Sequence, residues 1–151
     1  MGEFFTQFFS NKILWAGFSG WVLAQIIKVP LEYALHRNLD WSLLLSSGGM
    51  PSSHSALVIG TATAIGVQEG FNSPMFALAF VVAMVVIYDA LGVRRQAGDH
   101  ARVLNLMIDE LLTGHPLAEK ELKEMLGHTP REVVGGMVLG MVMSVVVMRA
   151  L

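Results

Sequence analysis

The sequence G-G-M-P-S-S-H-S-A at positions 48–56 decides how the rest of the chain is interpreted. Its glycines allow a free turn, Pro51 fixes φ, and Ser52 and Ser53 are residue types that cap helix N-termini. The stretch predicts a loop leading into a helix with His54 in its first turn. Backbone amides and the positive end of the helix dipole meet at such a point, which favours a phosphate-like anion beside a proton-transferring histidine. Taken alone, the stretch also fits an ordinary capped turn with an incidental histidine.

The composition is that of a membrane protein. The chain has 151 residues, of which 54% are hydrophobic, and its mean hydropathy is +0.57. We expect one membrane-embedded domain over residues 1–151. A helical span needs about 20 mostly apolar residues, and four long segments carry no Asp, Glu, Lys or Arg. These segments are 13–27, 41–68, 70–88 and 133–148.

The predicted fold class is an all-α integral membrane protein with about four transmembrane helices plus an amphipathic helix on the catalytic face. The predicted spans are 13–31, 53–70, 75–88 and 133–148. Residues 96–113 have the spacing of an amphipathic helix that lies along the membrane or packs beneath the bundle. A short solvated helix is expected after Pro116, and Trp41–Leu45 is expected at the interface or dipping back into it.

Two of the predicted spans carry stripes of small residues. Ala56, Gly60 and Ala64 recur at four-residue spacing in the second span, and Gly136 and Gly140 form a G-x-x-x-G face on the last one. Small residues let helix backbones approach closely in a membrane. The last span is therefore a candidate partner for the second.

Counting the spans predicts that the polar groups of interest share one membrane face. A chain that crosses four times brings the end of span one, the start of span two, the end of span three and the start of span four to the same side. The residues at these positions are Lys28, His54, Asp89, Arg94, Arg95, His128 and Glu132.

The basic residues predict the orientation of this face. Eight of the ten fall on the same side as the histidines, and only Lys12 and Arg149 fall on the other. Under the positive-inside rule the face with the histidines is cytoplasmic and both termini lie outside.

Two histidines at helix N-termini, with an acid four residues after one of them, suit phosphoryl transfer through a covalent intermediate. His128 can attack phosphorus, Glu132 can orient it, and His54 can protonate the leaving alcohol. The phosphate charge would be neutralised by other groups on the same face, aided by backbone amides. The candidate phosphate-binding residues are Lys28, Arg94, Arg95, Ser52 and Ser53.

Three segments together resemble a known family. Residues 51–54 (P-S-S-H), 88–95 (Y-D-A-L-G-V-R-R) and 127–133 (G-H-T-P-R-E-V) are similar to the divergent branch of the type 2 phosphatidic acid phosphatase superfamily, which is related to vanadium-dependent haloperoxidases. The resemblance implies a membrane phosphatase that acts on lipid phosphates or pyrophosphates through a phosphohistidine, without a metal or other cofactor. It implies a phospholipid or isoprenoid phosphate substrate, contact with the lipid bilayer and no nucleic acid.

The chain departs from the superfamily pattern at identifiable positions. Ser53 replaces the glycine of the P-S-G-H motif, Glu132 replaces an aspartate, and Leu122 stands where the pattern has an arginine. Lys28 matches the lysine of the K-x6-R-P motif, although Arg37 follows at a different spacing. Either of the two arginines at the end of span three is a candidate replacement for the missing phosphate clamp.

Two further features of the sequence bear on the resemblance. Arg94 and His100 repeat the R-x5-H spacing, which makes His100 an alternative nucleophile, but Leu104 stands where the acid should follow. The chain has fewer helices than the superfamily's usual six, so a homodimer is a possible way to complete the bundle.

Two other functions compete with the phosphohistidine mechanism. A magnesium-dependent lipid phosphatase would use carboxylates, which suit this ion. Its candidate ligands are Asp89, Asp99, His100, Asp109 and Glu110. A non-catalytic membrane scaffold is the other alternative, since small-residue faces suit helix assembly. The chain has no cysteine, which excludes disulfides and thiolate metal sites.

Overall fold

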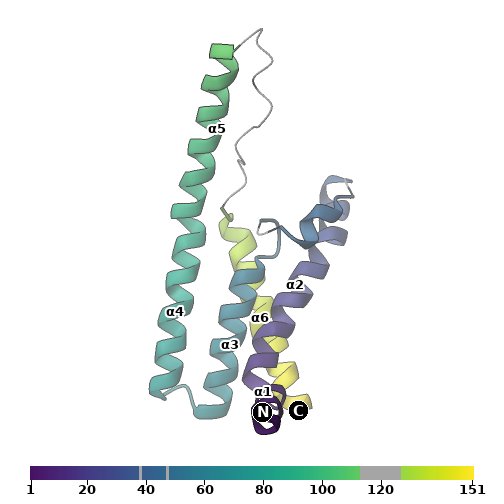
Figure 1. The fold of residues 1–151 in the computed structure, drawn as a ribbon, viewed down its shortest axis with the longest axis vertical. Helices are drawn as coiled ribbons and strands as arrows, with labels where there is room; N and C mark the ends of the chain where they lie inside the picture. The colour runs from purple at the N-terminus through teal and green to yellow at the C-terminus, as the bar shows by residue number, and fades with distance from the viewer. Residues whose placement is uncertain (38, 47, 113–126) are drawn as a thin grey trace.

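The computed structural model describes residues 1–37, 39–46, 48–112 and 127–151, and every element in this part of the chain is helical (Figure 1). This confirms the predicted all-α fold class. The short helix expected after Pro116 falls outside the described residues. The elements are α1 (Gly2–Phe9), α2 (Lys12–His36), the 3-10 helix η1 (Trp41–Leu44), α3 (Ser53–Glu69), α4 (Pro74–Leu91), α5 (Val93–Leu112) and α6 (Pro130–Ala150).

Within the described residues, three helical segments are long and apolar enough to cross a membrane. They are Lys12–Leu35, Pro74–Ile108 and Pro130–Ala150. The remaining predicted span is α3, whose 17 residues extend about 26 Å at 1.5 Å per residue, slightly less than the ~30 Å of bilayer hydrocarbon. It contacts α2, α4 and α6, so its neighbours rather than lipid cover most of its length.

The core of the bundle is formed by α2, α3 and α6, which pack through small residues. A side chain at Gly140 would collide with the backbone of Ala56, and Gly60 lies against the carbonyl oxygen of Gly140. Gly17 of α2 packs against Thr61 of α3, and Gly60 of α3 also lies against the backbone of Ala16 and Gly17. The predicted pairing of the small faces of α3 and α6 is therefore confirmed, and α2 joins the same contact.

The first span extends beyond its predicted end at residue 31. Helix α2 continues through Pro30 to His36 and ends at Arg37, whose φ of 57° lies in the left-handed region. Proline removes one helical hydrogen bond and its ring crowds the carbonyl of the preceding turn, so a helix passes through it only where packing holds the flanking turns. The following η1 is tied back to α2, because the side-chain amide of Gln25 donates a hydrogen bond to the carbonyl oxygen of Leu44 at 2.9 Å.

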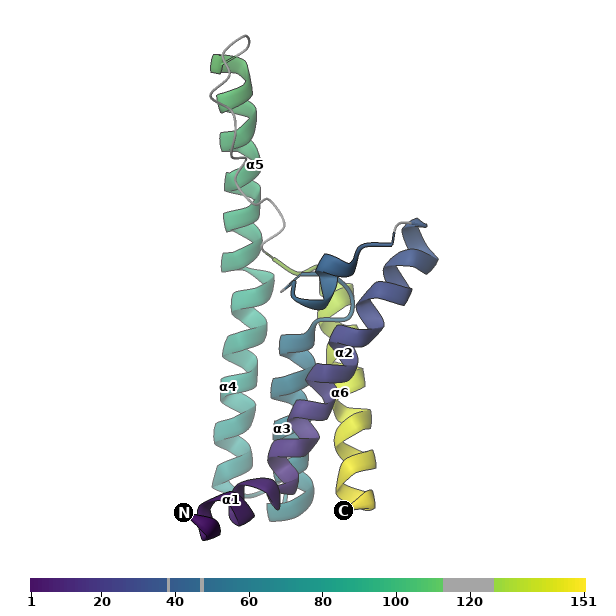
Figure 2. The same cartoon turned by 45° about the vertical axis from the view of Figure 1, so that its right-hand side comes forward.

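The amphipathic segment is expected to lie along the membrane or to pack beneath the bundle, and it does not pack beneath the bundle. Helix α5 continues the line of α4 beyond the ends of the other helices (Figures 1 and 2), and α4 is the described element that it contacts. Helical hydrogen bonding passes through the joint at Gly92, whose N–H donates to Tyr88 O at 2.9 Å and whose carbonyl accepts from Gln96 N at 3.0 Å. The amphipathic pattern of residues 96–113 predicts a helix but not its direction, so it did not show that α5 continues α4.

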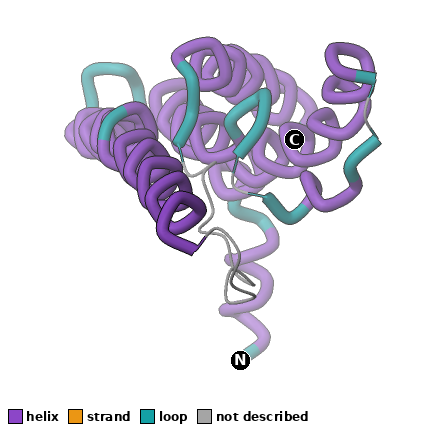
Figure 3. Tube along the Cα trace, turned by 90° about the horizontal axis from the view of Figure 1, so that it is seen from above, coloured by secondary structure: helices purple, strands orange, loops and turns teal. Residues whose placement is uncertain are grey.

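Both ends of the chain lie at the same end of the bundle (Figure 1). The ammonium of Lys12 donates a hydrogen bond to the carbonyl oxygen of Leu151. Helix α1 lies across this end, nearly perpendicular to the bundle (Figures 2 and 3), and its four phenylalanines are exposed, as expected for an interfacial aromatic cluster. The start of α3, the end of α4 and the start of α6 meet at the opposite end.

Candidate functional site

Two backbone hydrogen bonds join the helix ends that carry the histidines. The N–H of Ser52, just before α3, donates to the carbonyl oxygen of Glu132 in α6 at 2.9 Å. The N–H of His128, just before α6, donates to the carbonyl oxygen of Ala90 in α4 at 3.1 Å. These bonds fix the starts of α3 and α6 and the end of α4 relative to one another.

His128 and Glu132 form a hydrogen-bonded pair at the start of α6. His128 is only 4% exposed, and its Nδ1 lies 2.8 Å from Oε2 of Glu132. An ionised carboxylate can only accept, so Nδ1 carries the proton and donates it to Glu132. The other ring nitrogen, Nε2, then carries the free lone pair, which is the arrangement of an activated histidine nucleophile.

His54 lies in the first turn of α3 and faces His128. The centres of the two rings are 6.5 Å apart, with the ring planes inclined at 54°. Reacting atoms approach to about 3–3.5 Å before a bond forms, so a group placed between the rings would be in reach of both. The structure thus brings together two histidines that are 74 positions apart in the sequence.

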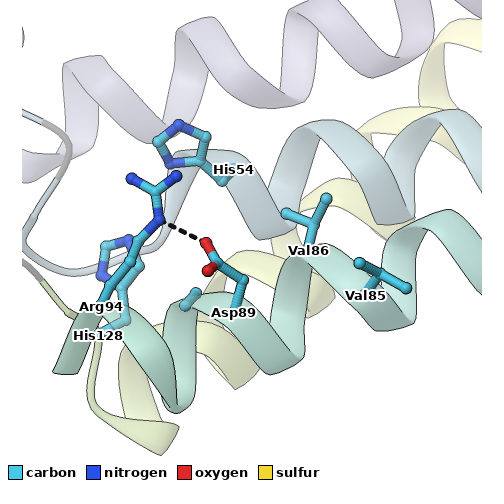
Figure 4. A pocket seen from close by; sticks show the side chains of 7 residues that line it. His54, Val85, Val86, Asp89, Arg94 and His128 are labelled. Carbon is cyan, nitrogen blue, oxygen red and sulfur yellow. Dashed lines mark hydrogen bonds and ion pairs between the residues drawn. The ribbon is translucent and has the colours of Figure 1, made fainter. Parts of the chain in front are cut away.

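The two rings line a pocket of about 310 Å³ (Figure 4). Arg94 lines it too, and its Nε forms an ion pair with Oδ2 of Asp89 at 2.6 Å. The Arg94 side chain remains 55% exposed, and the ion pair through Nε leaves the other guanidinium nitrogens available to a second anion. The residues that line the pocket are His54, Val85, Val86, Asp89, Ala90, Arg94 and His128.

Lys28 is buried next to the start of α3 and does not line the pocket. It is 1% exposed, and its Nζ donates hydrogen bonds to Ser46 O at 2.8 Å and to Ser53 Oγ at 3.5 Å. The ammonium therefore contacts Ser53, the residue that precedes His54 in the sequence. Its charge acts on the pocket at a distance rather than by contact.

The hydroxyl and amide of Ser52 already have partners inside the protein. Its Oγ caps α3 by accepting a hydrogen bond from Ser55 N at 3.3 Å and another from Ser55 Oγ at 3.0 Å. Its N–H is bonded to Glu132. Both Ser52 and Ser53 are buried and lie outside the pocket lining, so they shape the helix start rather than meet the pocket directly.

Two of the candidate residues lie away from the histidine pair. Arg95 is exposed and does not line the pocket, and its backbone packs against Gly127, where any side chain would collide with it. His100 is exposed on α5, beyond the pocket. Among the described side chains, no three of the His, Asp and Glu residues gather as a metal site would require, and Asp89 is paired with Arg94.

Thr129 holds Glu132 in position, and the motifs that point to the histidines do not include this role. Its Oγ1 donates to Oε1 of Glu132 at 3.0 Å and accepts from the N–H of the same residue at 3.4 Å. Each oxygen of the carboxylate thus has its own donor, Thr129 on one side and His128 on the other. The T-x-x-E spacing at 129–132 is a recognisable capping signature and could have identified this residue.

Replacing Thr129 by alanine is expected to lower the free energy of unfolding by about 1 kcal/mol, because the α6 cap is lost. In a chain of this size that corresponds to a melting temperature lower by about 2–4 °C. Thermal unfolding of the purified protein in detergent measures the shift. Thr129→Ser keeps the hydroxyl and should melt close to wild type; equal melting of the alanine and serine variants would contradict a capping role.

The fold and the site define a helical membrane protein with a histidine–carboxylate pair facing a second histidine at one end of its bundle. The chain belongs to the Divergent PAP2 family, whose model matches residues 9–143. It is similar to the uncharacterized membrane protein YuiD of Bacillus subtilis (strain 168), with 41% identity over 151 aligned positions that cover 93% of this chain and 96% of that protein. No solved structure matches the chain significantly.

Proposed function

We propose that this protein hydrolyses phosphomonoesters or pyrophosphates of membrane lipids through a phosphohistidine intermediate on His128. The observation that carries the proposal is the pairing of His128 with Glu132 opposite His54, with the ring centres 6.5 Å apart across a pocket that Arg94 also lines. Membership of the Divergent PAP2 family and the apolar spans support a lipid rather than a soluble substrate.

In the first step, Nε2 of His128 attacks phosphorus and the bond from phosphorus to the leaving oxygen breaks. The Nδ1 proton stays hydrogen-bonded to Glu132, which stabilises the positive charge that develops on the ring. Protonated His54, on the other side of the pocket, gives its proton to the leaving oxygen. The products of this step are the lipid alcohol, or the lipid phosphate when the substrate is a pyrophosphate, and phosphorylated His128.

In the second step, water attacks the phosphorus of the intermediate. His54, now neutral, accepts a proton from the water, and the bond between phosphorus and Nε2 of His128 breaks. Inorganic phosphate leaves and both histidines return to their starting states. Each bond that is hydrolysed, ester or anhydride, consumes one water. Both histidines end the cycle in the protonation states in which they began it.

Positive groups around the pocket stabilise the charge on the phosphoryl oxygens. Arg94 is the cation that lines the pocket, and Asp89 holds its guanidinium at 2.6 Å while leaving it partly exposed. Lys28 adds a buried positive charge behind Ser53. We propose that Arg94 takes the place of the motif arginine whose position is occupied by Leu122, because a guanidinium can bind two oxygens of a phosphate at once.

We propose that the histidine face is cytoplasmic and that both termini lie on the outer side. Both ends of the chain lie at the end of the bundle opposite the starts of α3 and α6 (Figure 1), and there Lys12 donates a hydrogen bond to Leu151. Most basic residues belong to the histidine end, as the positive-inside rule requires of a cytoplasmic face.

Phosphate release by the purified protein tests this function. We expect release from at least one member of a panel of lipid phosphates and pyrophosphates, at a rate that a metal chelator does not change and that vanadate lowers. Vanadate inhibits because it adopts the trigonal bipyramidal geometry of a phosphoryl group under attack. Loss of activity with chelator would favour the magnesium-dependent mechanism, and no release from any substrate would favour a non-catalytic scaffold.

A further inference from the structure

The pocket of the two histidines is apolar on the side that faces along the bundle. Val85 and Val86 of α4 line it there, one helical turn from Asp89 (Figure 4). A second hollow of about 270 Å³ lies between α3 and α4, further toward the end that carries the chain termini. Its lining residues are Leu57, Val58, Thr61, Met75, Leu78, Ala79 and Val82.

The two hollows follow the same faces of the same two helices. On α3, His54 lines the first hollow, while Leu57, Val58 and Thr61, at spacings of three, four and seven residues, line the second. Positions with these spacings share one side of a helix. On α4, Val82 of the second hollow is likewise seven residues from Asp89 of the first. The two hollows therefore lie one beyond the other along the seam between α3 and α4.

We propose that this seam holds one hydrocarbon chain of the lipid whose phosphate lies between the histidines. This inference rests on the proposed function and specifies where the hydrocarbon chain of the substrate binds. From Asp89 to Met75 the seam follows 14 residues of α4, which is about 21 Å at 1.5 Å per residue. That is about two thirds of the ~30 Å hydrocarbon thickness, so the seam suits a long chain lying parallel to the helices.

The charge distribution favours a lipid phosphate over a neighbouring helix as the occupant. The polar end of the seam carries two histidines and Arg94, which suit an anionic headgroup although Asp89 already pairs with this arginine, and the rest is lined almost wholly by apolar side chains. A hydrocarbon chain gains little transfer free energy on moving from the bilayer to this seam, because both surroundings are apolar. The seam therefore acts by positioning, and we expect it to distinguish substrates by chain length.

Kinetics with two substrates and two matched variants test the chain position. Ala79 lines the seam, whereas Ala77 is exposed about 200° away on the same helix. We expect Ala79→Phe to lower kcat/KM for hexadecyl phosphate at least about tenfold and to leave that for water-soluble butyl phosphate within about twofold. Ala77→Phe should leave both unchanged. Equal loss for the two substrates in Ala79→Phe, or no loss, would overturn the chain position.

Photocrosslinking of the wild-type protein gives a readout that does not depend on catalysis. A hexadecyl phosphate probe with a photoreactive diazirine in its chain should label the α3 and α4 segments around Thr61 and Ala79, and inorganic vanadate should reduce the labelling. The matched probe that ends in a hydroxyl should label them much less. Equal labelling by both probes would show an ordinary bilayer lipid and overturn the inference. Seam labelling by the phosphate probe without hydrolysis of either substrate would contradict the proposed function alone.

Discussion

Replacing His128 by alanine is expected to lower kcat for phosphate release by at least about a thousandfold, because the covalent route then has no nucleophile. The same variant should lose the acid-labile, alkali-stable phosphoenzyme that a histidine intermediate gives when wild-type protein is quenched during turnover of a 32P-labelled substrate. His100→Ala is the matched control, since that histidine is exposed on α5 beyond the pocket, and it should retain wild-type labelling and rate. Labelling that persists in His128→Ala and disappears in His100→Ala would reverse the assignment.

His54→Ala separates the two histidine roles. A general acid contributes about a hundredfold to ten-thousandfold when the leaving group is a poor one such as an alcohol. A nitrophenolate leaves without a proton, so phosphoenzyme formation from nitrophenyl phosphate should be much less affected by His54→Ala than formation from an alkyl phosphate. Release of inorganic phosphate should remain slow, because water still needs a base in the second step. Equal losses with both leaving groups would contradict the proton-donor role.

The parts of the fold that could be predicted depend on local patterns. Charge-free segments located three of the spans, because each crossing must be apolar over its whole length. The small residues of α3 and α6 predicted their pairing, because the approach seen between Gly140 and Ala56 leaves no room for a side chain on Gly140. Counting crossings predicted one shared face for both histidines, and their ring centres lie 6.5 Å apart.

The sequence could not predict which side chains of α5 face the pocket, because this depends on how α5 continues from α4 at Gly92. Arg94 and Arg95 are equivalent in the sequence, but successive residues point about 100° apart on a helix, so only one can face the pocket. Arg94 lines it, and Arg95 does not. The choice is set by the register through Gly92, where α4 passes into α5 with little change of direction (Figure 1).

The environment of Lys28 also depends on tertiary structure. The sequence predicts that Lys28 lies near the end of the first span, where a lysine can extend its ammonium toward water. In the structure it is buried and donates hydrogen bonds to Ser46 and Ser53. This gives a physical reason for the serine at a position where the superfamily motif has glycine, because the Ser53 hydroxyl supplies an oxygen that glycine lacks.

Gly136→Ala is expected to destabilise the bundle and the site together. A methyl group at this position would lie 2.2 Å from the carbonyl oxygen of Ser52, and a backbone atom cannot move aside without shifting the start of α3. Overpacking of this kind costs about 2–3 kcal/mol, which corresponds to a melting temperature lower by about 5–10 °C. Thermal unfolding in detergent measures the loss.

The neighbouring Gly135 provides the control for this prediction. A methyl group there would meet only Met50 and Pro51, at 3.5 and 3.6 Å, which are ordinary contacts. Because alanine favours helix over glycine by up to about 1 kcal/mol, Gly135→Ala should melt at or above the wild-type temperature. Equal melting of the two variants would contradict the close approach of α6 to Ser52. The hydrogen bond from Ser52 to Glu132 depends on the same close approach. If the start of α3 shifts, the two histidines move apart, so Gly136→Ala should lower phosphate release even at temperatures where the variant is folded.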